Sequence, residues 1–278
     1  LKDFANGTLQ GVAHGLARLW ENNLWPYNTP SKKFYERIDK IFVGTQKIIK
    51  KDGSLEEAFP NEGSYCVTAL VAYDLLCTIE LLHNVIDKKI LIKWKVIVSP
   101  LIKYLKKYDE KHAFISNHLA TASAALLRWH NIENDHEALI KFKKLLNRII
   151  DKQSKEGWYL EYEGFDAGYQ SLCTYYLSDI FLNYKSEKLK ASLSLSIDFI
   201  KNFVHPDGSF GGIYCSRSTR IFYPSGFIVL QSITKRTLDF NHFLHKSIKD
   251  KKIITLSSID ESNLIPMFNS YCWAACIK

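Results

Sequence analysis

Apolar residues recur at the spacing of amphipathic helices along nearly the whole chain. With only 13 Gly and 7 Pro, the sequence has few of the turn residues that an all-β chain needs. The chain is therefore predicted to be all-α. Eight helices are predicted at 5–22, 32–51, 64–84, 88–108, 116–131, 135–154, 167–184 and 188–204. Three further helices are predicted at 222–236, 238–249 and 261–278.

The predicted helices are of two kinds that alternate along the chain. Helix 64–84 is apolar nearly all round, as expected of a helix buried between neighbours. Helix 135–154 keeps one polar side, which carries Lys141, Lys143 and Lys144. We interpret this alternation as a series of hairpins, each with a buried inner helix and a partly exposed outer helix.

A short motif recurs ahead of the inner helices and indicates an internal repeat. Residues 52–55 (Asp-Gly-Ser-Leu) and 207–210 (Asp-Gly-Ser-Phe) are near copies, and 156–159 (Glu-Gly-Trp-Tyr) is a third variant. One unit of about 52 residues fits all three and places the missing member near 109–114, a polar break before a helix. Five or six such hairpins would close into an α/α toroid. We predict one domain, residues 1–278, whose breaks gather on one rim around the mouth of a central cavity.

The charge balance is basic, because 37 Lys and Arg against 29 Asp and Glu give a net charge of +8. Such a balance suits nucleic acid, anionic lipid or an acidic polysaccharide. The aromatic residues are spread through the helices and do not interleave with a basic patch, so nucleic-acid binding is not expected. No apolar run approaches the roughly 18 residues of a membrane helix, so no membrane span is expected.

The cysteines and the N-terminus bear on cofactors and compartment. The six Cys include no CxxC pair and are spread widely, which argues against a zinc site. The sequence contains no P-loop, no GxGxxG and no HExxH motif. We therefore expect no metal and no organic cofactor. The scattered cysteines and the lack of an apolar signal segment predict a cytoplasmic protein, or a periplasmic or secreted one if the N-terminus is trimmed.

Three stretches of the sequence resemble a known group of enzymes. They are Ser-Asn-His-Leu-Ala at 116–120, Glu-Gly-Trp-Tyr-Leu-Glu-Tyr at 156–162 and Gly-Tyr-Gln at 168–170. Together they resemble the helical toroid of the alginate lyases and the heparinase II/III-like polysaccharide lyases. The Asp-Gly-Ser breaks are also similar to those of a second toroid family, the terpene cyclases and protein prenyltransferases. The first resemblance implies an enzyme that acts on an acidic, uronate-containing polysaccharide as a β-eliminating lyase.

Such an elimination needs a group that neutralises the substrate carboxylate, a base, and an acid for the leaving oxygen. Asn117 and His118 follow Ser116, a good N-cap, in the first turn of a predicted inner helix. There the helix dipole favours an anion and a neutral imidazole. We predict that His118 is the base and that Asn117 binds the carboxylate; the alternative is that both serve only the helix end.

Other residues near the breaks complete the predicted site. By resemblance, Tyr169 is the proton-transferring tyrosine, with Tyr162 and Tyr65 as rivals. Arg217 and Arg220 follow the last break, and either provides a bidentate clamp for a carboxylate. The residues expected to contact substrate through acidic, amide, aromatic or guanidinium groups are Glu57, Glu62, Tyr65, Trp158, Glu161, Tyr162, Asp166, Gln170 and Arg220.

Two other functions fit the same residues. A glycoside hydrolase would use Glu57 or Glu62 together with a carboxylate of the third break, Glu161 or Asp166. A non-catalytic glycan-binding or scaffold toroid of a polysaccharide biosynthesis pathway would use the rim for recognition alone. Away from the rim, His14 lies on a small-residue helix face and is predicted to be a satisfied core histidine.

Overall fold

The computed structural model describes residues 6–57, 59, 61–213, 216–231 and 239–277. Within these residues the chain consists of helices and connecting loops, with isolated β-bridges and no strand. In chain order the elements are η1 (Gly7–Gly11), α1 (Val12–Glu21), α2 (Ser31–Ile48), α3 (Tyr65–Leu82), α4 (Lys88–Lys107), α5 (Ser116–Glu133), α6 (His136–Asp151), α7 (Ala167–Asn183), α8 (Glu187–Ile200), η2 (Lys201–Phe203), α9 (Ser225–Gln231), α10 (Phe240–Lys249) and α11 (Glu261–Cys276).

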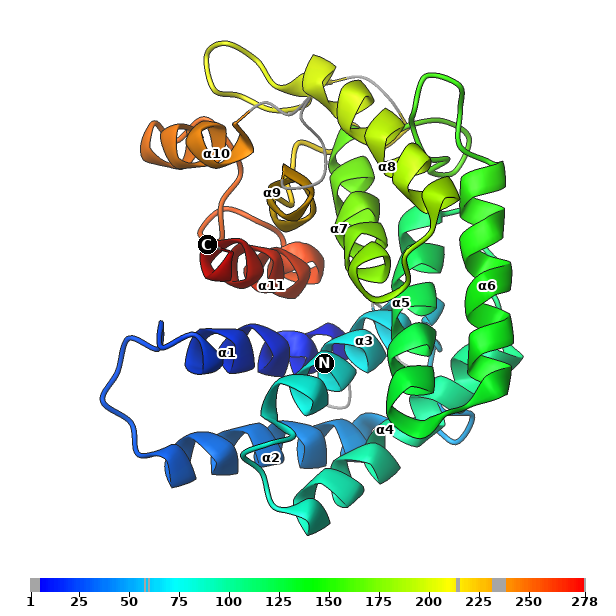
Figure 1. Cartoon of the computed structure of the whole chain (residues 1–278), viewed down its shortest axis with the longest axis vertical. Helices are drawn as coiled ribbons and strands as arrows, with labels where there is room; N and C mark the ends of the chain where they lie inside the picture. The colour runs from blue at the N-terminus through cyan, green and yellow to red at the C-terminus, as the bar shows by residue number, and fades with distance from the viewer. Residues whose placement is uncertain (1–5, 58, 60, 214–215, 232–238, 278) are drawn as a thin grey trace. The chain divides into compact units, whose positions relative to one another are not determined.

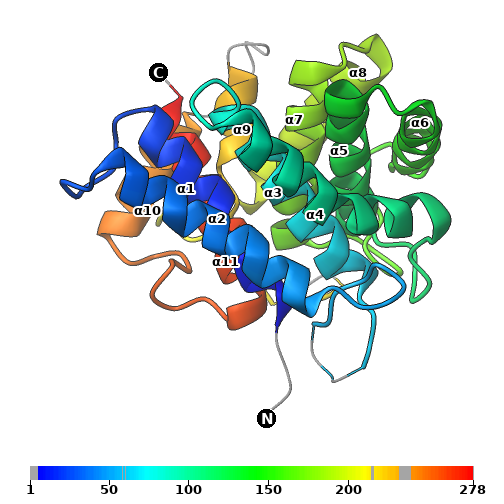
Figure 2. The same cartoon turned by 90° about the horizontal axis from the view of Figure 1, so that it is seen from below.

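The chain divides into two compact units. The N-terminal unit comprises Leu1–Asp109 and Ala125–Phe142, and the C-terminal unit comprises Glu110–Ala124 and Lys143–Lys278. In the N-terminal unit α3 packs against α1 and α4, and α4 packs against α2 (Figure 2). In the C-terminal unit α7 packs against α8 and α9, and α9 contacts α10 and α11 (Figure 1). The single domain predicted from the sequence stays a prediction.

The helices predicted from periodicity are confirmed with small changes at their ends. The first begins as the 3-10 turn η1, and the eighth ends in the 3-10 turn η2. The helix predicted at 222–236 begins three residues later, at Ser225 directly after Pro224, which fits the preference for proline at a helix start. The end predicted for it lies outside the described residues.

The alternation of buried and amphipathic helices is also present within each unit. The inner helices α3 and α7 are buried on nearly every side, whereas α4 and α8 keep exposed polar positions. By length and composition alone α3 is apolar enough to cross a membrane, but 83% of it is buried inside the protein, as in a core helix. The sequence-based expectation that no segment is apolar enough to span a membrane is therefore wrong for α3 as far as length and composition go.

The three glycine breaks adopt the same left-handed turn. Gly53, Gly157 and Gly208 have φ of +91°, +105° and +90°, which only glycine adopts without strain. In the two Asp-Gly-Ser copies the serine donates both its N–H and its hydroxyl to the preceding aspartate, at 2.7–3.0 Å. The repeat inferred from the sequence is therefore a repeat of backbone geometry.

Two of these glycines also lie against the outer helix of the next hairpin. A Cβ on Gly53 would overlap the carbonyl of Pro100 in α4, and a Cβ on Gly157 would overlap the carbonyl of Leu195 in α8. The break near 109–114 has no glycine, and there the Glu110 carboxylate accepts the N–H groups of the next two residues at 2.9 and 3.0 Å. This break is a polar loop, as predicted, but a carboxylate rather than a glycine turn organises its backbone.

We expect Gly157→Ala to lower the free energy of unfolding by about 2 kcal/mol or more, because the new methyl group meets backbone and the φ is unfavourable. Gly44→Ala is the matched control. Gly44 lies within α2, and its Cβ would meet only the end of the flexible Gln10 side chain. It should stabilise the protein by about 0.5–1 kcal/mol. Denaturant unfolding measures both, and equal effects would contradict the role of the turn.

Candidate active site

A cleft of about 700 Å³ lies in the C-terminal unit, where three loops meet. One wall comes from the loop before α5, another from the short hairpin before α7, and the third from the loop before α9. The residues that line it are His112, Ala113, Tyr162, Glu163, Gly164, Phe165, Ser216 and Arg217. The sequence predicts that the loops at the breaks gather around one cavity. Within the C-terminal unit, the loops at the second, third and fourth breaks do line one cleft.

A buried carboxylate, Glu161, joins the first two loops. Its two oxygens accept the backbone N–H of Asn117 at 2.9 Å and the side-chain N–H of Asn117 at 2.7 Å. Both residues are buried, and burial raises the pKa of Glu161 to about 8, even though the hydrogen bonds from Asn117 favour the charged form. The amide predicted to bind a substrate carboxylate thus binds a carboxylate of the protein.

This pairing also corrects the N-cap assigned to α5. The hydroxyl of Ser116 donates to the carbonyl of Leu160 at 2.6 Å, and the Ser116 N–H donates to the same carbonyl at 3.0 Å. Because the serine is engaged with that carbonyl, the acceptor for the first turn of α5 comes from Glu161 instead.

The hairpin that carries Glu161 is very short. The N–H and carbonyl of Glu161 pair with the carbonyl and N–H of Gly164 at 2.7 and 3.3 Å. Between them Tyr162 has a φ of +62°, and its N–H donates to the carbonyl of Phe114 at 2.9 Å. A left-handed tyrosine is a strained conformation that surrounding contacts must hold. The hairpin thus fixes the Tyr162 ring beside the cleft.

A second buried carboxylate, Asp166, joins the third loop to the start of α7. Its Oδ1 accepts the N–H of Tyr169 at 3.0 Å as the N-cap of α7. Its Oδ2 accepts the N–H groups of Arg217 and Thr219 at 3.2 and 3.1 Å. Asp166 is therefore a positioning residue that sets the backbone from which Arg217 projects.

The Arg217 guanidinium lies against two tyrosine rings. Its central carbon is 4.8 Å from the centre of the Tyr162 ring and 6.0 Å from that of Tyr169. Arg217 is exposed and lines the cleft. Stacking on aromatic faces orients the planar cation and leaves its edge available for an anion. Two residues predicted as clamp and proton donor, Arg217 and Tyr169, are thus brought together.

His118 forms a close pair with Glu110. The ring Nδ1 lies 2.7 Å from the Glu110 carboxylate; that side chain is 2% exposed and the His118 side chain is 18% exposed. Burial raises the pKa of Glu110, but the hydrogen bonds from His118 and from two backbone N–H groups outweigh it and hold that pKa below its usual value. An ionised Glu110 accepts the Nδ1 proton, which directs the lone pair of a neutral imidazole to Nε2.

Sequence reasoning did not select Glu110. It lies in the polar break eight residues before His118, and its only signal is an acidic side chain close in sequence to the candidate base. The same carboxylate accepts the N–H of His112, which lines the cleft. Glu110 therefore connects His118 to the cleft wall.

Of the predicted site residues of this unit, Tyr162 and Arg217 line the cleft, and His118 and Tyr169 are not among its lining residues. Three more lie away from it. Gln170 is buried and its amide serves the interior, accepting the N–H of Tyr159 at 2.8 Å. Trp158 is half-buried and donates its indole N–H to Glu156 at 3.0 Å. Arg220 lines a separate, smaller cleft.

Glu57, Glu62 and Tyr65 belong to the N-terminal unit. Glu57 accepts a hydrogen bond from the hydroxyl of Ser64 at 2.8 Å, and Glu62 is exposed. Tyr65 is buried, with its ring centre 6.4 Å from that of Tyr104. Their roles in substrate binding stay predictions.

The N-terminal unit also holds a buried charged cluster around His14. The His14 Nδ1 lies 2.9 Å from Asp74, and its Nε2 accepts from Arg18 at 2.8 Å. Burial, followed by the charges of Arg18 and Arg128, lowers the pKa of His14 well below its usual value. The interpretation of His14 as a satisfied core histidine is confirmed.

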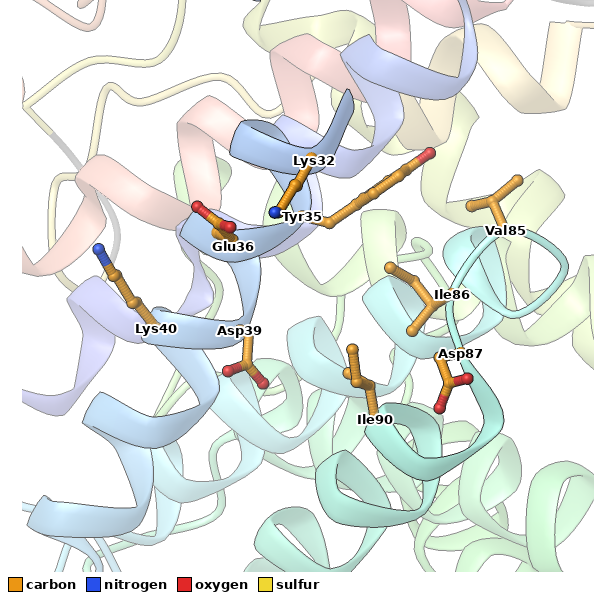
Figure 3. A pocket seen from close by; sticks show the side chains of 9 residues that line it. All are labelled: Lys32, Tyr35, Glu36, Asp39, Lys40, Val85, Ile86, Asp87 and Ile90. Atoms are coloured by element: carbon orange, nitrogen blue, oxygen red, sulfur yellow. The ribbon is translucent and has the colours of Figure 1, made fainter. Parts of the chain in front are cut away.

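The same unit carries an apolar groove of about 610 Å³ between α2 and the start of α4 (Figure 3). Val85, Ile86 and Ile90 form one side and Tyr35 faces them (Figure 3). Three carboxylates also line this groove, and one of them, Asp39, accepts hydrogen bonds from Lys93 and from the indole of Trp94. In the part of the chain that the structure describes, no three His, Cys, Asp or Glu side chains gather as metal ligands would.

No protein-family model matches this sequence, and no curated protein matches it significantly. Solved structures do resemble it. The cellobiose 2-epimerase from Bacillus thermoamylovorans B4167 superposes with a TM-score of 0.67, covering 97% of this chain and 87% of its own, at 9% identity. A family 76 glycoside hydrolase from a bovine Bacteroides thetaiotaomicron strain superposes with a TM-score of 0.64, covering 96% of this chain and 68% of its own, at 9% identity. A polysaccharide lyase superposes with a TM-score of 0.57, covering 98% of this chain and 91% of its own, at 11% identity.

These neighbours are α/α toroid enzymes that act on glycans. At such low identity the likeness shows the fold alone, because one fold hosts many activities. The chain therefore has the α/α toroid fold that the alternating helices predict. The neighbours do not single out the alginate lyases or the heparinase II/III-like enzymes.

Ionisation of Glu161 should destabilise the protein. Its folded pKa, about 8, is above the value of 4.5 expected in the unfolded chain. The protonated Glu161 carboxyl therefore contributes its full stabilisation of the folded protein below pH 4.5, and this contribution is lost as the pH rises through 8. Glu161→Gln is always neutral, and a turned Asn117 amide would accept its N–H. Relative to this variant, the wild type should lose on the order of 5 kcal/mol of unfolding free energy across that range.

The measurement is denaturant unfolding of both proteins between pH 4.5 and 9. Glu163→Gln is the matched control, since Glu163 is exposed on the same hairpin and its removal should leave the pH dependence unchanged. Parallel stability curves for the wild type and Glu161→Gln would show that burial does not raise this pKa.

Proposed function

We propose that the cleft binds an acidic, uronate-containing polysaccharide and cleaves it by β-elimination. The observation that carries the proposal is the Arg217 guanidinium held against Tyr162 and Tyr169 at the cleft. A fixed, planar cation with a free edge matches the two oxygens of a uronate carboxylate. The fold likeness to a polysaccharide lyase and to other glycan-acting enzymes supports the same class of substrate.

The His118–Glu110 pair supplies the base of this mechanism. His118 Nε2 takes the proton from the carbon beside the uronate carboxylate, and Glu110 stabilises the imidazolium that forms. Arg217 neutralises the charge that spreads onto the carboxylate as that bond breaks. The electron pair of the broken C–H bond becomes a carbon–carbon double bond, and the neighbouring glycosidic C–O bond breaks.

Tyr169 supplies the acid. Its hydroxyl gives a proton to the leaving glycosidic oxygen, which becomes a free hydroxyl on the released sugar. The Arg217 guanidinium beside the ring favours the phenolate left behind. The proton on His118 then returns to Tyr169 through solvent, so the site ends as it began. Tyr162 stays the rival for this role, because its ring lies nearer to Arg217.

Hydrolysis is the second candidate, and one observation favours it. A general acid needs a raised pKa, and Glu161 has one of about 8. Both oxygens of Glu161 accept N–H groups of Asn117, however, and the oxygens of Asp166 accept three backbone N–H groups. The carboxylates that hydrolysis requires are thus engaged in holding the loops, which makes elimination the better-supported reaction.

The first test follows the ultraviolet absorbance of an unsaturated uronate product with alginate, polygalacturonate and heparin as substrates. His118→Ala and Tyr169→Phe should each lower kcat by about 10²–10⁴-fold, because each removes a proton-transfer group. His242→Ala is the matched control: it alters the second Asn-His pair of the sequence, on an exposed turn of α10, and should change nothing. New reducing ends without absorbance would replace elimination by hydrolysis, and binding without any product would leave a glycan-binding protein.

A second test separates the clamp from proton transfer. Arg217→Lys keeps the charge but loses the two-pronged guanidinium and its stacking, so KM should rise by about tenfold or more, with a smaller fall in kcat. Arg148→Lys is the control, since Arg148 lies over the ring of Phe114 in the same unit, 5.8 Å from its centre. An unchanged KM in Arg217→Lys would remove Arg217 from substrate binding.

A further inference from the structure

A second cleft in the C-terminal unit is lined in part by the loop that carries Arg217. It has a volume of about 300 Å³, and Arg220, from the same loop, lines it together with Lys251 and Lys252. Of the described residues that line this cleft, these three are cations, two are serines and none is acidic. Arg220 therefore lies in a wall whose described charged residues are all cations.

Three chain segments build this second cleft and pack closely on one another. A Cβ on Gly211 would come within 3.2–3.4 Å of Thr219 and Arg220, and its φ is +73°, so the turn after the fourth break packs directly on the Arg220 backbone. Across the cleft, Lys252 donates its N–H to the carbonyl of Ser247 at 2.9 Å. The side-chain carbons of Lys252 would lie 3.5–3.6 Å from a Cβ on Gly208.

One carboxylate is close to this cleft. Asp207 accepts the N–H and hydroxyl of Ser209 at 2.9 and 2.7 Å, and these hydrogen bonds, with a smaller contribution from Lys252, lower its pKa. Its Oδ1 is turned into the break and pairs with Ser209 there. The described lining has three cations and no acid, so the cleft surface is positively charged and attracts anions.

We propose that this second cleft binds another anionic group, a carboxylate or a sulfate, on the same acidic glycan that occupies the first cleft. The inference rests on the proposed function. Arg217 and Arg220 are three residues apart, so their Cα atoms are at most about 10 Å apart. A short oligosaccharide spans such a distance, so one chain with repeated negative charges reaches both arginines. Binding at two linked sites strengthens with chain length until both are filled.

The test is calorimetric binding of oligouronates from disaccharide to hexasaccharide, measured on the full chain at two salt concentrations. In Lys251→Gln/Lys252→Gln the affinity for the longest oligosaccharide should fall by about tenfold and depend less on salt, while the disaccharide affinity stays the same. Lys143→Gln/Lys144→Gln, an exposed lysine pair on α6, is the matched control and should behave as the wild type. Equal loss at every length, or none, would overturn the proposal.

Two further measurements keep this inference separate from the proposed function. Arg217→Gln should weaken binding at every length; if it has no effect while the double lysine variant still weakens the longer chains, the first cleft is not the uronate site. Inorganic sulfate, titrated alone, tests for an isolated anion site. Sulfate binding that the lysine variant abolishes, with no dependence on oligosaccharide length, would show that the second cleft does not serve the same glycan chain.

Discussion

The architecture depends on finding acceptors for the buried N-terminal N–H groups of the inner helices. These helices are apolar on nearly every side, so water does not reach their first turns, and an unpaired N–H there is costly. Each helix meets the need differently. Ser64 caps α3, Glu161 accepts from α5, Asp166 caps α7, and the hydroxyl of Ser270 accepts the first N–H of α9. Two of the four acceptors are carboxylates, and both lie directly behind the candidate site.

The same carboxylates therefore shape the site that they support. Glu161 binds Asn117 while its own backbone closes the hairpin that fixes Tyr162. Asp166 caps α7, whose first turn carries Tyr169, and holds the loop of Arg217. The same contacts support the loops and the candidate site, so a substitution that removes the acceptor oxygens of either acid would disturb both together. Only the exposed groups, above all Arg217, can be varied without disturbing a helix end.

The helices and the glycine breaks could be predicted because they are local. Periodicity reports which face a helix buries, and the Asp-Gly-Ser turn is made by neighbours in sequence, as at Gly53 and Gly208. Candidate site residues could be named from the sequence, but their hydrogen-bond partners could not. Asn117 and Glu161 are 44 residues apart, and nothing local shows that the side chains form a hydrogen bond. Glu110 was missed because a lone acid in a polar loop resembles every solvated acid around it.

The loops, rather than the shared fold, decide between the reactions that α/α toroids support. Epimerase, hydrolase and lyase structures all superpose on this chain, so the inner helices do not select the chemistry. In this chain the buried acids behind the first cleft are committed to helix ends and loop backbones. The cleft surface carries Arg217, whose guanidinium lies against the rings of Tyr162 and Tyr169, and the exposed carboxylate of Glu163. The His118–Glu110 pair is connected to the cleft wall through His112. The elimination that we propose would use the cation and the proton-transferring groups of this set, whereas hydrolysis would need a second free carboxylate beside Glu163.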